Sequence, residues 1–332
     1  MTSVGGSASR IESERASAGR IPDFFLVGHA KSGTTALYEM LGRHPQIFMP
    51  QSKEPWFLAD ELLERAPPRP EGTPSTLAEY EALFSDAKPN QLVGEASALY
   101  LWSRTAPARI AELAPEARIV AILREPTSFL RSLHMQFVES YVETQADLRQ
   151  ALALEPARRR GEQIPRHTYW PKALLYSEHT RYVELLRRYH ERFAPEQVLV
   201  LIYDDFRADN TATVKRVLRF LDVDDGVDVE PREANPSVGV RSGVAHRALH
   251  ALSVGHGPGS RTLKRAIKTV VPRQARRRLV RTTKEKLVYV PPAPPDEQLM
   301  AELRGQLKGE VQALSEYLDR DLVALWGYDD VQ

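Results

Sequence analysis

Cysteine is absent from this chain of 332 residues. That absence excludes disulfide bridges and thiolate metal sites, and it disfavours a disulfide-stapled secreted domain. No run of about 18 apolar residues occurs either, so the sequence predicts no membrane span. Residues 1–20 are rich in Ser, Gly, Arg and Glu and lack the apolar core of a signal peptide. We therefore expect these residues to form a disordered lead, and the protein to be soluble and cytoplasmic.

Net charge is small as well, because 45 Lys and Arg stand against 44 Asp and Glu and leave +1 at neutral pH. So little charge gives no bulk attraction to nucleic acid, and we expect no nucleic-acid partner. Residues 261–286 depart from this balance, with eleven Lys or Arg and a single acid, Glu285. Two interpretations stay open: peripheral contact with an anionic membrane surface or polyanionic acceptor, or a solvated helical pair.

What the sequence does contain is an alternation of short apolar strands and amphipathic helices. The expected strands are residues 24–27, 46–49, 91–95, 119–123 and 198–203, and the expected helices are 34–43, 105–113, 172–193, 210–221 and 296–318. This alternation predicts an α/β fold with a central, mostly parallel sheet between helices. We place the core domain at residues 21–250. Residues 251–332 are expected to form a basic helical extension, whose closing helix packs on the core.

The first strand runs into a glycine-rich loop, DFFLVGHAKSGTT. Gly28 and Gly33 have the spacing of a P-loop, but Thr34 stands where a nucleoside triphosphatase needs its lysine. The lysine lies inside the loop, at Lys31. What remains is an anion site made of backbone N–H groups, hydroxyls, one ammonium and a helix N-terminus, which suits a phosphate-bearing donor that needs no metal. Its predicted residues are Lys31, Ser32, Gly33, Thr34 and Thr35.

The stretch VGHAKSGTTAL resembles the donor-binding loop of sulfotransferases that use 3′-phosphoadenosine 5′-phosphosulfate. A second stretch, ARIVAILREPTSFLRS, carries Arg124 at a strand end and Ser132 eight residues later. This pair is similar to the family's 3′-phosphate site, where an arginine fork and a helix hydroxyl bind a phosphate. The loop NPSVGVRSG resembles the segment that closes over the donor and makes Arg241 a candidate phosphate ligand. The resemblance implies a P-loop-like three-layer fold and a donor site built before residue 221, apart from Arg241.

The segment QSKEPWFL resembles the N/K-E-x-x-F stretch of glycan sulfotransferases, in which the glutamate is the proposed base. The resemblance makes Glu54 the candidate base for the acceptor's proton. Trp56 and Phe57 would raise its pKa toward neutrality by desolvation. The alternative is that Glu54 merely pairs with Lys53, Lys31 or an arginine. Lys31 is the cation expected to steady the departing phosphate and the sulfuryl oxygens.

Acceptor contacts are expected at the end of a core strand, where open α/β sheets place ligands. The segment GEASALY occupies such a position, and Ser97 and Tyr100 are its candidate acceptor-binding residues. Heparan-type members of the family often carry a lysine where this chain has Ala96, which argues against a heparan-like acceptor. His134, two residues after Ser132, is a further candidate for acceptor or donor contact, with a structural role as the alternative.

The sequence thus predicts sulfuryl transfer from the phosphosulfate nucleotide, without a metal, to a hydroxyl or, as second choice, an amine. The acceptor would be a carbohydrate, glycolipid or secondary metabolite. A nucleotide-dependent kinase is one alternative, but it requires a lysine at position 34 and an acidic Mg²⁺ ligand where Arg124 stands. A non-catalytic nucleotide or sulfated-glycan binding protein is another, supported by the basic segment alone. The acceptor's identity and the oligomeric state stay open.

Overall fold

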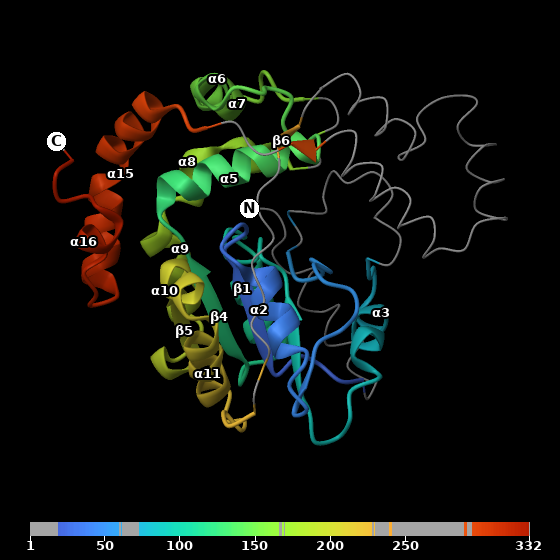
Figure 1. Cartoon of the computed structure of the whole chain (residues 1–332). Helices are drawn as coiled ribbons and strands as arrows, with labels where there is room; N and C mark the ends of the chain where they lie inside the picture. The colour runs from blue at the N-terminus through green and yellow to red at the C-terminus, as the bar shows by residue number, and fades with distance from the viewer. Residues whose placement is uncertain are drawn as a thin grey trace, which may run out of the picture.

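A five-stranded parallel sheet, in the order β2-β3-β1-β4-β5, forms the centre of the computed structural model (Figure 1). The structure describes residues 19–59, 61, 73–165, 168, 170–227, 229, 239–240, 289–290 and 294–331. The sheet strands are β1 (Phe24–Gly28), β2 (Ile47–Phe48), β3 (Leu92–Ala96), β4 (Arg118–Leu123) and β5 (Val198–Ile202). A separate antiparallel pair joins β6 (Gly239–Val240) to β7 (Tyr289–Val290). The predicted parallel α/β sheet is confirmed.

Strand β1 shows why the sheet needs helices on both faces. Successive side chains of a strand point to opposite faces. Phe24 and Leu26 belong to one apolar cluster, Phe25 and Val27 to another, and all four are fully buried. A strand buried on both faces reads as a continuous apolar run, which is the FFLV pattern of this sequence.

Helices cover both faces of the sheet (Figure 1). The α-helices of the core domain are α2 (Thr34–Leu41), α3 (Leu77–Glu81), α4 (Ala106–Leu113), α5 (Pro126–Glu139), α6 (Leu148–Ala153), α7 (Glu155–Arg159), α8 (Tyr176–His179), α9 (Tyr182–His190), α10 (Tyr203–Ala208) and α11 (Asn210–Phe220). Short 3₁₀ turns occur at η2 (Ala82–Phe84), η3 (Pro171–Leu174) and η4 (Pro195–Gln197). Helices α2 and α11 supply buried residues to the cluster that holds Phe24 and Leu26, whereas α4, α5 and α9 pack on the opposite face.

The single helix predicted for residues 172–193 is wrong, since this region consists of η3, α8 and α9. The backbone carbonyls of Ala173 and His179 accept contacts from histidine rings: His179 Nε2 lies 2.9 Å from Ala173 O, and His29 Nε2 lies 3.0 Å from His179 O. Side-chain partners of this kind compete with the regular ladder of helical hydrogen bonds. Helix α10, which follows β5 directly, was not predicted.

Two further helices, α15 (Glu297–Tyr317) and α16 (Leu322–Trp326), return the end of the chain to the core. In Figure 1 they lie beside α5 and α9, and α15 contacts both. Leu299, Leu303, Val311 and Leu314 of α15 are buried in the same cluster as Phe25. The leucines of the closing helix therefore pack on the domain.

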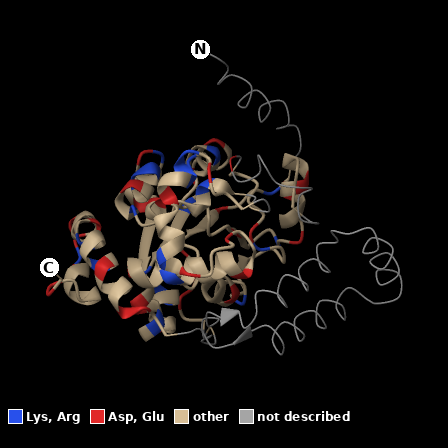
Figure 2. Ribbon diagram, turned by 90° about the horizontal axis from the view of Figure 1, so that it is seen from above, with Lys and Arg blue, Asp and Glu red and all other residues tan. Residues whose placement is uncertain are grey.

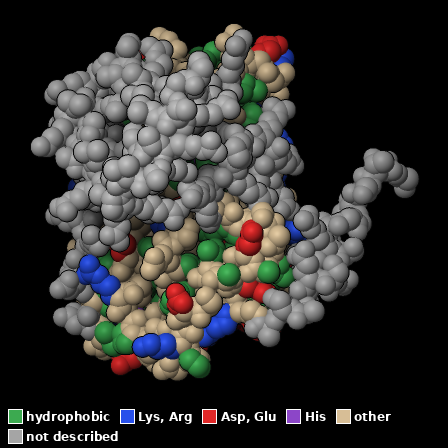
Figure 3. Space-filling model, turned by 90° about the vertical axis from the view of Figure 1, so that its right-hand side faces the viewer, with side chains coloured by type: hydrophobic (Ala, Val, Ile, Leu, Met, Phe, Trp, Pro, Cys, Tyr) green, Lys and Arg blue, Asp and Glu red, His purple; other side chains and the backbone are tan. Residues whose placement is uncertain are grey.

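Acidic and basic residues are interspersed along the described ribbon (Figure 2), and the described part of the face in Figure 3 carries side chains of both signs. The predictions for residues 261–286 and Arg241 lie outside the described residues. Within the residues that the structure describes, no helix combines the length and the apolar character that a bilayer crossing requires.

Candidate functional site

The loop between β1 and α2 is held in a conformation that its glycines permit. Gly28 has φ 150°, and a Cβ atom there would lie 2.6 Å from the Ala98 carbonyl oxygen. Gly33, at the N-cap of α2, has φ 88°. Lys31 also has positive φ, 63°, a strained state for a residue with a side chain, of the kind that clusters at functional sites. The loop therefore presents its N–H groups at the positive end of α2, as an anion site requires.

Cations converge on this loop. Burial lowers the pKa of Lys31; the positive charges of Arg124 and Lys53 lower it further, and Glu139 opposes them. Arg124 Nη1 donates a hydrogen bond to the Lys31 carbonyl oxygen at 3.2 Å. Crowded cations favour an anionic ligand, because the ligand relieves their mutual repulsion. The structure thus brings Lys31 and Arg124 together, although the sequence places them in separate motifs.

Lys53 also reaches the loop. Its Nζ lies 3.2 Å from Thr35 Oγ1, 3.5 Å from Thr34 Oγ1 and 3.0 Å from Glu54 Oε1. From the sequence, Lys53 was expected only as a pairing partner of Glu54. A signal for its wider role is its place just after β2, because the carboxyl ends of parallel strands meet at one edge of the sheet.

Glu54 lies in a short segment with an unusual backbone. Glu54 and Trp56 have φ of 61° and 50°, which is rare for residues other than glycine. Glu54 Oε2 accepts hydrogen bonds from Trp56 Nε1 at 2.8 Å and from the Ala98 N–H at 3.0 Å, while Oε1 pairs with Lys53. The Glu54 side chain keeps 25% of its surface exposed. The carboxylate is thus fixed in place and still accessible from outside.

Residues at and after the end of β3 accept hydrogen bonds from the backbone of this segment. The Glu54 N–H donates to the Ala96 carbonyl oxygen, the Trp56 N–H to Ser97 Oγ, and the Leu58 N–H to the Tyr100 hydroxyl. Ser97 and Tyr100 are fully buried. The structure therefore places these two predicted acceptor contacts beneath the Glu54 segment, where they position it.

Near Glu54 lies a second carboxylate, Glu95, which was not among the predicted site residues. It is fully buried, and burial raises its pKa to about 7. Oε2 accepts a hydrogen bond from the Tyr80 hydroxyl at 2.9 Å, and Oε1 has no hydrogen-bond partner within the described part of the chain. The available signal was an acid inside the apolar strand LVGEA, because a carboxylate is rarely buried without a reason.

Arg124 and Ser132 line one cavity of about 340 Å³. Thr127, Ser128, Arg131 and Met135 belong to the same wall. The opposite wall comes from the end of the chain, and its residues are Pro295, Glu297, Met300, Ala301 and Arg304. The two predicted phosphate ligands thus line one cavity. Helix α15 adds residues beyond position 221 to it, because its buried leucines hold this helix against α5.

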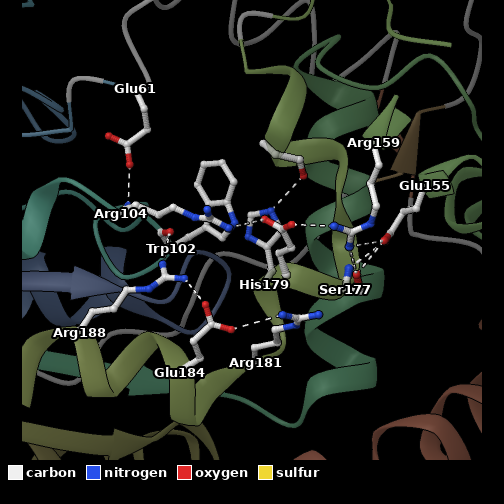
Figure 4. Close-up of polar contacts among 12 residues, drawn as sticks. Glu61, Trp102, Arg104, Glu155, Arg159, Ser177, His179, Arg181, Glu184 and Arg188 are labelled. Carbon is white, nitrogen blue, oxygen red and sulfur yellow. Dashed lines mark hydrogen bonds and ion pairs between the residues drawn. The ribbon is translucent and has the colours of Figure 1, made fainter. Parts of the chain in front are cut away.

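The histidines near the loop are buried and pack against aromatic rings of the core. His29 is fully buried beside Phe129, and burial lowers its pKa to about 3. His179 stacks on Trp102 with 4.9 Å between ring centroids, and burial lowers its pKa to about 4. Figure 4 shows Trp102 and His179 above the ion pair of Arg188 and Glu184 on α9. Both histidines are therefore neutral at physiological pH.

His134 occupies a similar position on α5. It is buried, and its Nε2 lies 2.9 Å from the Gln145 carbonyl oxygen. Burial is the main cause that lowers its pKa. The structure does not bring His134 to the cavity that Arg124 and Ser132 line.

The parallel α/β sheet and the P-loop-like turn between β1 and α2 together define a protein with a P-loop-like fold. The family model of the sulfotransferase domain matches residues 21–233. The chain therefore belongs to the sulfotransferase family and is a transferase, and the resemblance seen in the sequence is confirmed.

Similar proteins agree with this assignment. A human heparan sulfate glucosamine 3-O-sulfotransferase 6 is 31% identical over 109 residues, which cover 33% of this chain and 28% of that protein. A mouse carbohydrate sulfotransferase 15 is 28% identical over 156 residues, which cover 36% of this chain and 28% of that protein. The matches thus span less than a third of these curated relatives.

A solved sulfotransferase from Alicyclobacillus acidocaldarius has a similar fold, with a TM-score of 0.65 and 24% identity. The match covers 92% of this chain and 99% of that one. At this level of identity the likeness concerns the fold alone.

Proposed function

We propose that this transferase moves a sulfuryl group from 3′-phosphoadenosine 5′-phosphosulfate to a hydroxyl, or as second choice an amine, of a carbohydrate, glycolipid or secondary metabolite. One observation carries the proposal. The glycine-rich loop and the cavity of Arg124 and Ser132 are two anion sites joined by the Arg124–Lys31 hydrogen bond at 3.2 Å. Two adjacent anion sites suit a nucleotide with phosphate groups on both its 3′ and 5′ positions.

The residues present fit such a donor. The N–H groups and hydroxyls of Ser32–Thr35 and the ammonium groups of Lys31 and Lys53 would hold its 5′ side. Arg124 and Ser132 would hold its 3′-phosphate, and Arg241, outside the described residues, is a proposed further ligand. When bound, the donor supplies an activated sulfuryl group on a phosphate leaving group.

Glu54 is the proposed base. Its Oε1 would take the proton of the acceptor hydroxyl, while Lys53, which touches both Oε1 and Thr35, links the base to the donor loop. The hydrogen bonds from Trp56 and Ala98 to Oε2 leave Oε1 as the atom oriented for this task. Ser97 and Tyr100 act as positioning residues beneath it.

A sugar is the acceptor class that the surroundings of Glu54 favour. Trp56 and Trp170 are both partly exposed, and their rings meet edge to face with centroids 4.9 Å apart. Aromatic rings of this kind offer an apolar face with a polar edge, which suits the mixed surface of a sugar. The names of the curated relatives, which act on heparan sulfate or carbohydrate, point the same way. Ala96 still argues against a heparan-like chain.

Calorimetry tests the donor assignment. The product adenosine 3′,5′-bisphosphate should bind without Mg²⁺ and much more tightly than adenosine 5′-monophosphate. Because Arg124 would form a charge-assisted contact with the 3′-phosphate, Arg124→Ala should weaken bisphosphate binding by about 1.5–3 kcal/mol. Equal affinity of the wild-type protein for the two nucleotides would contradict the proposed function.

A further inference from the structure

The wall of the cavity opposite Arg124 belongs to the closing helix α15. Three arginines line the cavity: Arg124, Arg131 and Arg304, against a single carboxylate, Glu297. This excess of positive charge comes from two parts of the chain that lie about 170 residues apart in sequence. The cavity is therefore complete only when α15 packs on α5.

The sequence of α15 directs Arg304 toward the cavity. Residues four apart lie on one face of a helix. Leu299 and Leu303 are buried in the core, while Met300 and Arg304, each one position later, line the cavity. The buried leucines thus fix the rotation of α15 and with it the side of the helix that faces Arg124.

A chain of contacts also sets the position of Arg304 along the cavity. Its guanidinium carbon lies 5.6 Å from the ring centroid of Tyr328. The Tyr328 hydroxyl donates to Glu125 Oε1 at 2.6 Å, and Glu125 caps α5 by accepting from the Thr127 and Ser128 N–H groups. The end of the chain is thereby tied to the first turn of the helix that carries Ser132.

Within the residues that the structure describes, Arg304 forms no ion pair with a carboxylate. Its guanidinium instead lies over the ring of Tyr328. A guanidinium beside a second arginine favours an anionic ligand, because the anion is attracted to both groups. Arginine binds phosphate through a planar pair of donors, so a phosphate is the anion that this geometry fits.

We propose that Arg304 is a further ligand of the donor's 3′-phosphate, so that α15 takes part in selecting nucleotides phosphorylated at the 3′ position. The inference rests on the proposed function, because it takes the cavity of Arg124 and Ser132 to be the 3′-phosphate site. It adds a residue from the end of the chain to a site that the sequence motifs place entirely within the core domain.

The test is calorimetric titration of the full chain with adenosine 3′,5′-bisphosphate and with adenosine 5′-monophosphate. Arg304→Gln should weaken bisphosphate binding about 10- to 100-fold and change monophosphate binding less than about three-fold, because the latter lacks the 3′-phosphate. Arg304→Lys, which keeps the charge without the fork, should recover part of the loss. Arg149→Gln is the matched control, since Arg149 pairs with Glu302 and Asp296 of the α15 region without lining the cavity.

The outcomes separate the two ideas. If Arg304→Gln binds the bisphosphate as tightly as wild type while Arg124→Ala binds it weakly, the proposed function stands and the role of Arg304 is overturned. If Arg304→Gln and Arg149→Gln lose affinity for both nucleotides alike, α15 acts only as a scaffold, and the role of Arg304 is again overturned. If the wild-type protein does not distinguish the two nucleotides, the proposed function itself fails.

Discussion

Glu54 combines a strained backbone with a dense set of hydrogen bonds. A residue with a side chain at φ 61° costs on the order of 1–3 kcal/mol, and it persists only where its surroundings hold it. The contacts from Ala96, Ala98 and Trp56 supply that hold. Strain of this kind at a partly exposed carboxylate is better explained by a need for a fixed position than by packing, because packing alone does not require it.

Replacement of Glu54 tests its role as the base. Glu54→Gln keeps the shape and removes the basicity, so turnover should fall by roughly 10²- to 10⁴-fold. Donor affinity should change little, since the donor loop and Arg124 remain intact. The measurement is steady-state kinetics with labelled donor together with bisphosphate calorimetry. Near wild-type turnover would place the base elsewhere.

Glu95 is a buried group whose titration should affect stability. Its pKa is raised by burial to about 7, against an ordinary value of 4.5. Between these pH values the folded protein holds a proton that the unfolded chain has lost, so the free energy of unfolding falls as pH rises. His29 and His179 have lowered pKa values and act in the opposite sense, losing stability as pH falls below 6.5.

Glu95→Gln isolates one of these opposing contributions, because glutamine is neutral at every pH. We compare the free energy of unfolding of the variant with that of wild type at each pH. The difference, variant minus wild type, should be larger at pH 8 than at pH 5 by on the order of 2–3 kcal/mol. Urea unfolding at the two pH values measures this difference, and Glu162→Gln, on an exposed side chain, serves as control. Parallel pH profiles for Glu95→Gln and wild type would show that Glu95 does not carry a raised pKa.

At the level of helices and strands, the sequence predicted the elements and motifs that are formed by residues close together in the chain. The FFLV strand, the loop with its displaced lysine and the spacing of Arg124 and Ser132 are all sequence-local, and each is found in the expected element. The boundaries of β3 and β4 agree with the prediction to within one residue at each end. Strong apolar runs between turn signals define strands wherever both faces are buried.

Contacts between distant segments were not predictable in the same way. Where the expected helix at residues 172–193 is interrupted, the His179 carbonyl oxygen contacts the ring of His29, 150 residues away in the sequence. The burial of Ser97 and Tyr100 depends on the segment of Glu54 lying over the end of β3. Similarly, the arginine that α15 brings to the cavity has no local signature, since it follows from the packing of the leucines next to it.

At the scale of the whole molecule, the end of the chain is fastened to the α/β core on the side of α10. Arg320 Nη1 and Nη2 donate to the two carboxylate oxygens of Asp205 at 2.5 and 2.7 Å. Trp326 Nε1 donates to Asp204 Oδ2 at 2.9 Å. These contacts hold α16 against the core, and α16 in turn packs on α15. The contacts of Arg320 and Trp326 with α10 therefore help to position α15, which forms one wall of the cavity.

Arg320→Ala measures how much this fastening stabilises the molecule. The pair is bidentate, but 33% of Arg320 and 40% of Asp205 is exposed, so solvent screens much of its Coulomb energy. We expect a loss of about 0.5–1 kcal/mol, which corresponds to a fall in Tm of about 1–4 °C. Because Arg320 holds down the Asp205 pKa, the difference from wild type should also shrink as pH falls through the folded-state pKa of Asp205.

Thermal unfolding at neutral pH, at low pH and in about 1 M salt, where the Debye length is about 3 Å, provides the measurement. Arg160→Ala is the control, since Arg160 pairs with Glu162 at 2.9 Å on an exposed surface and connects only neighbouring residues. That variant should unfold within about 1 °C of wild type, because an isolated exposed pair contributes little. An Arg320→Ala protein with wild-type Tm under all three conditions would show that the Arg320–Asp205 pair does not stabilise the fold.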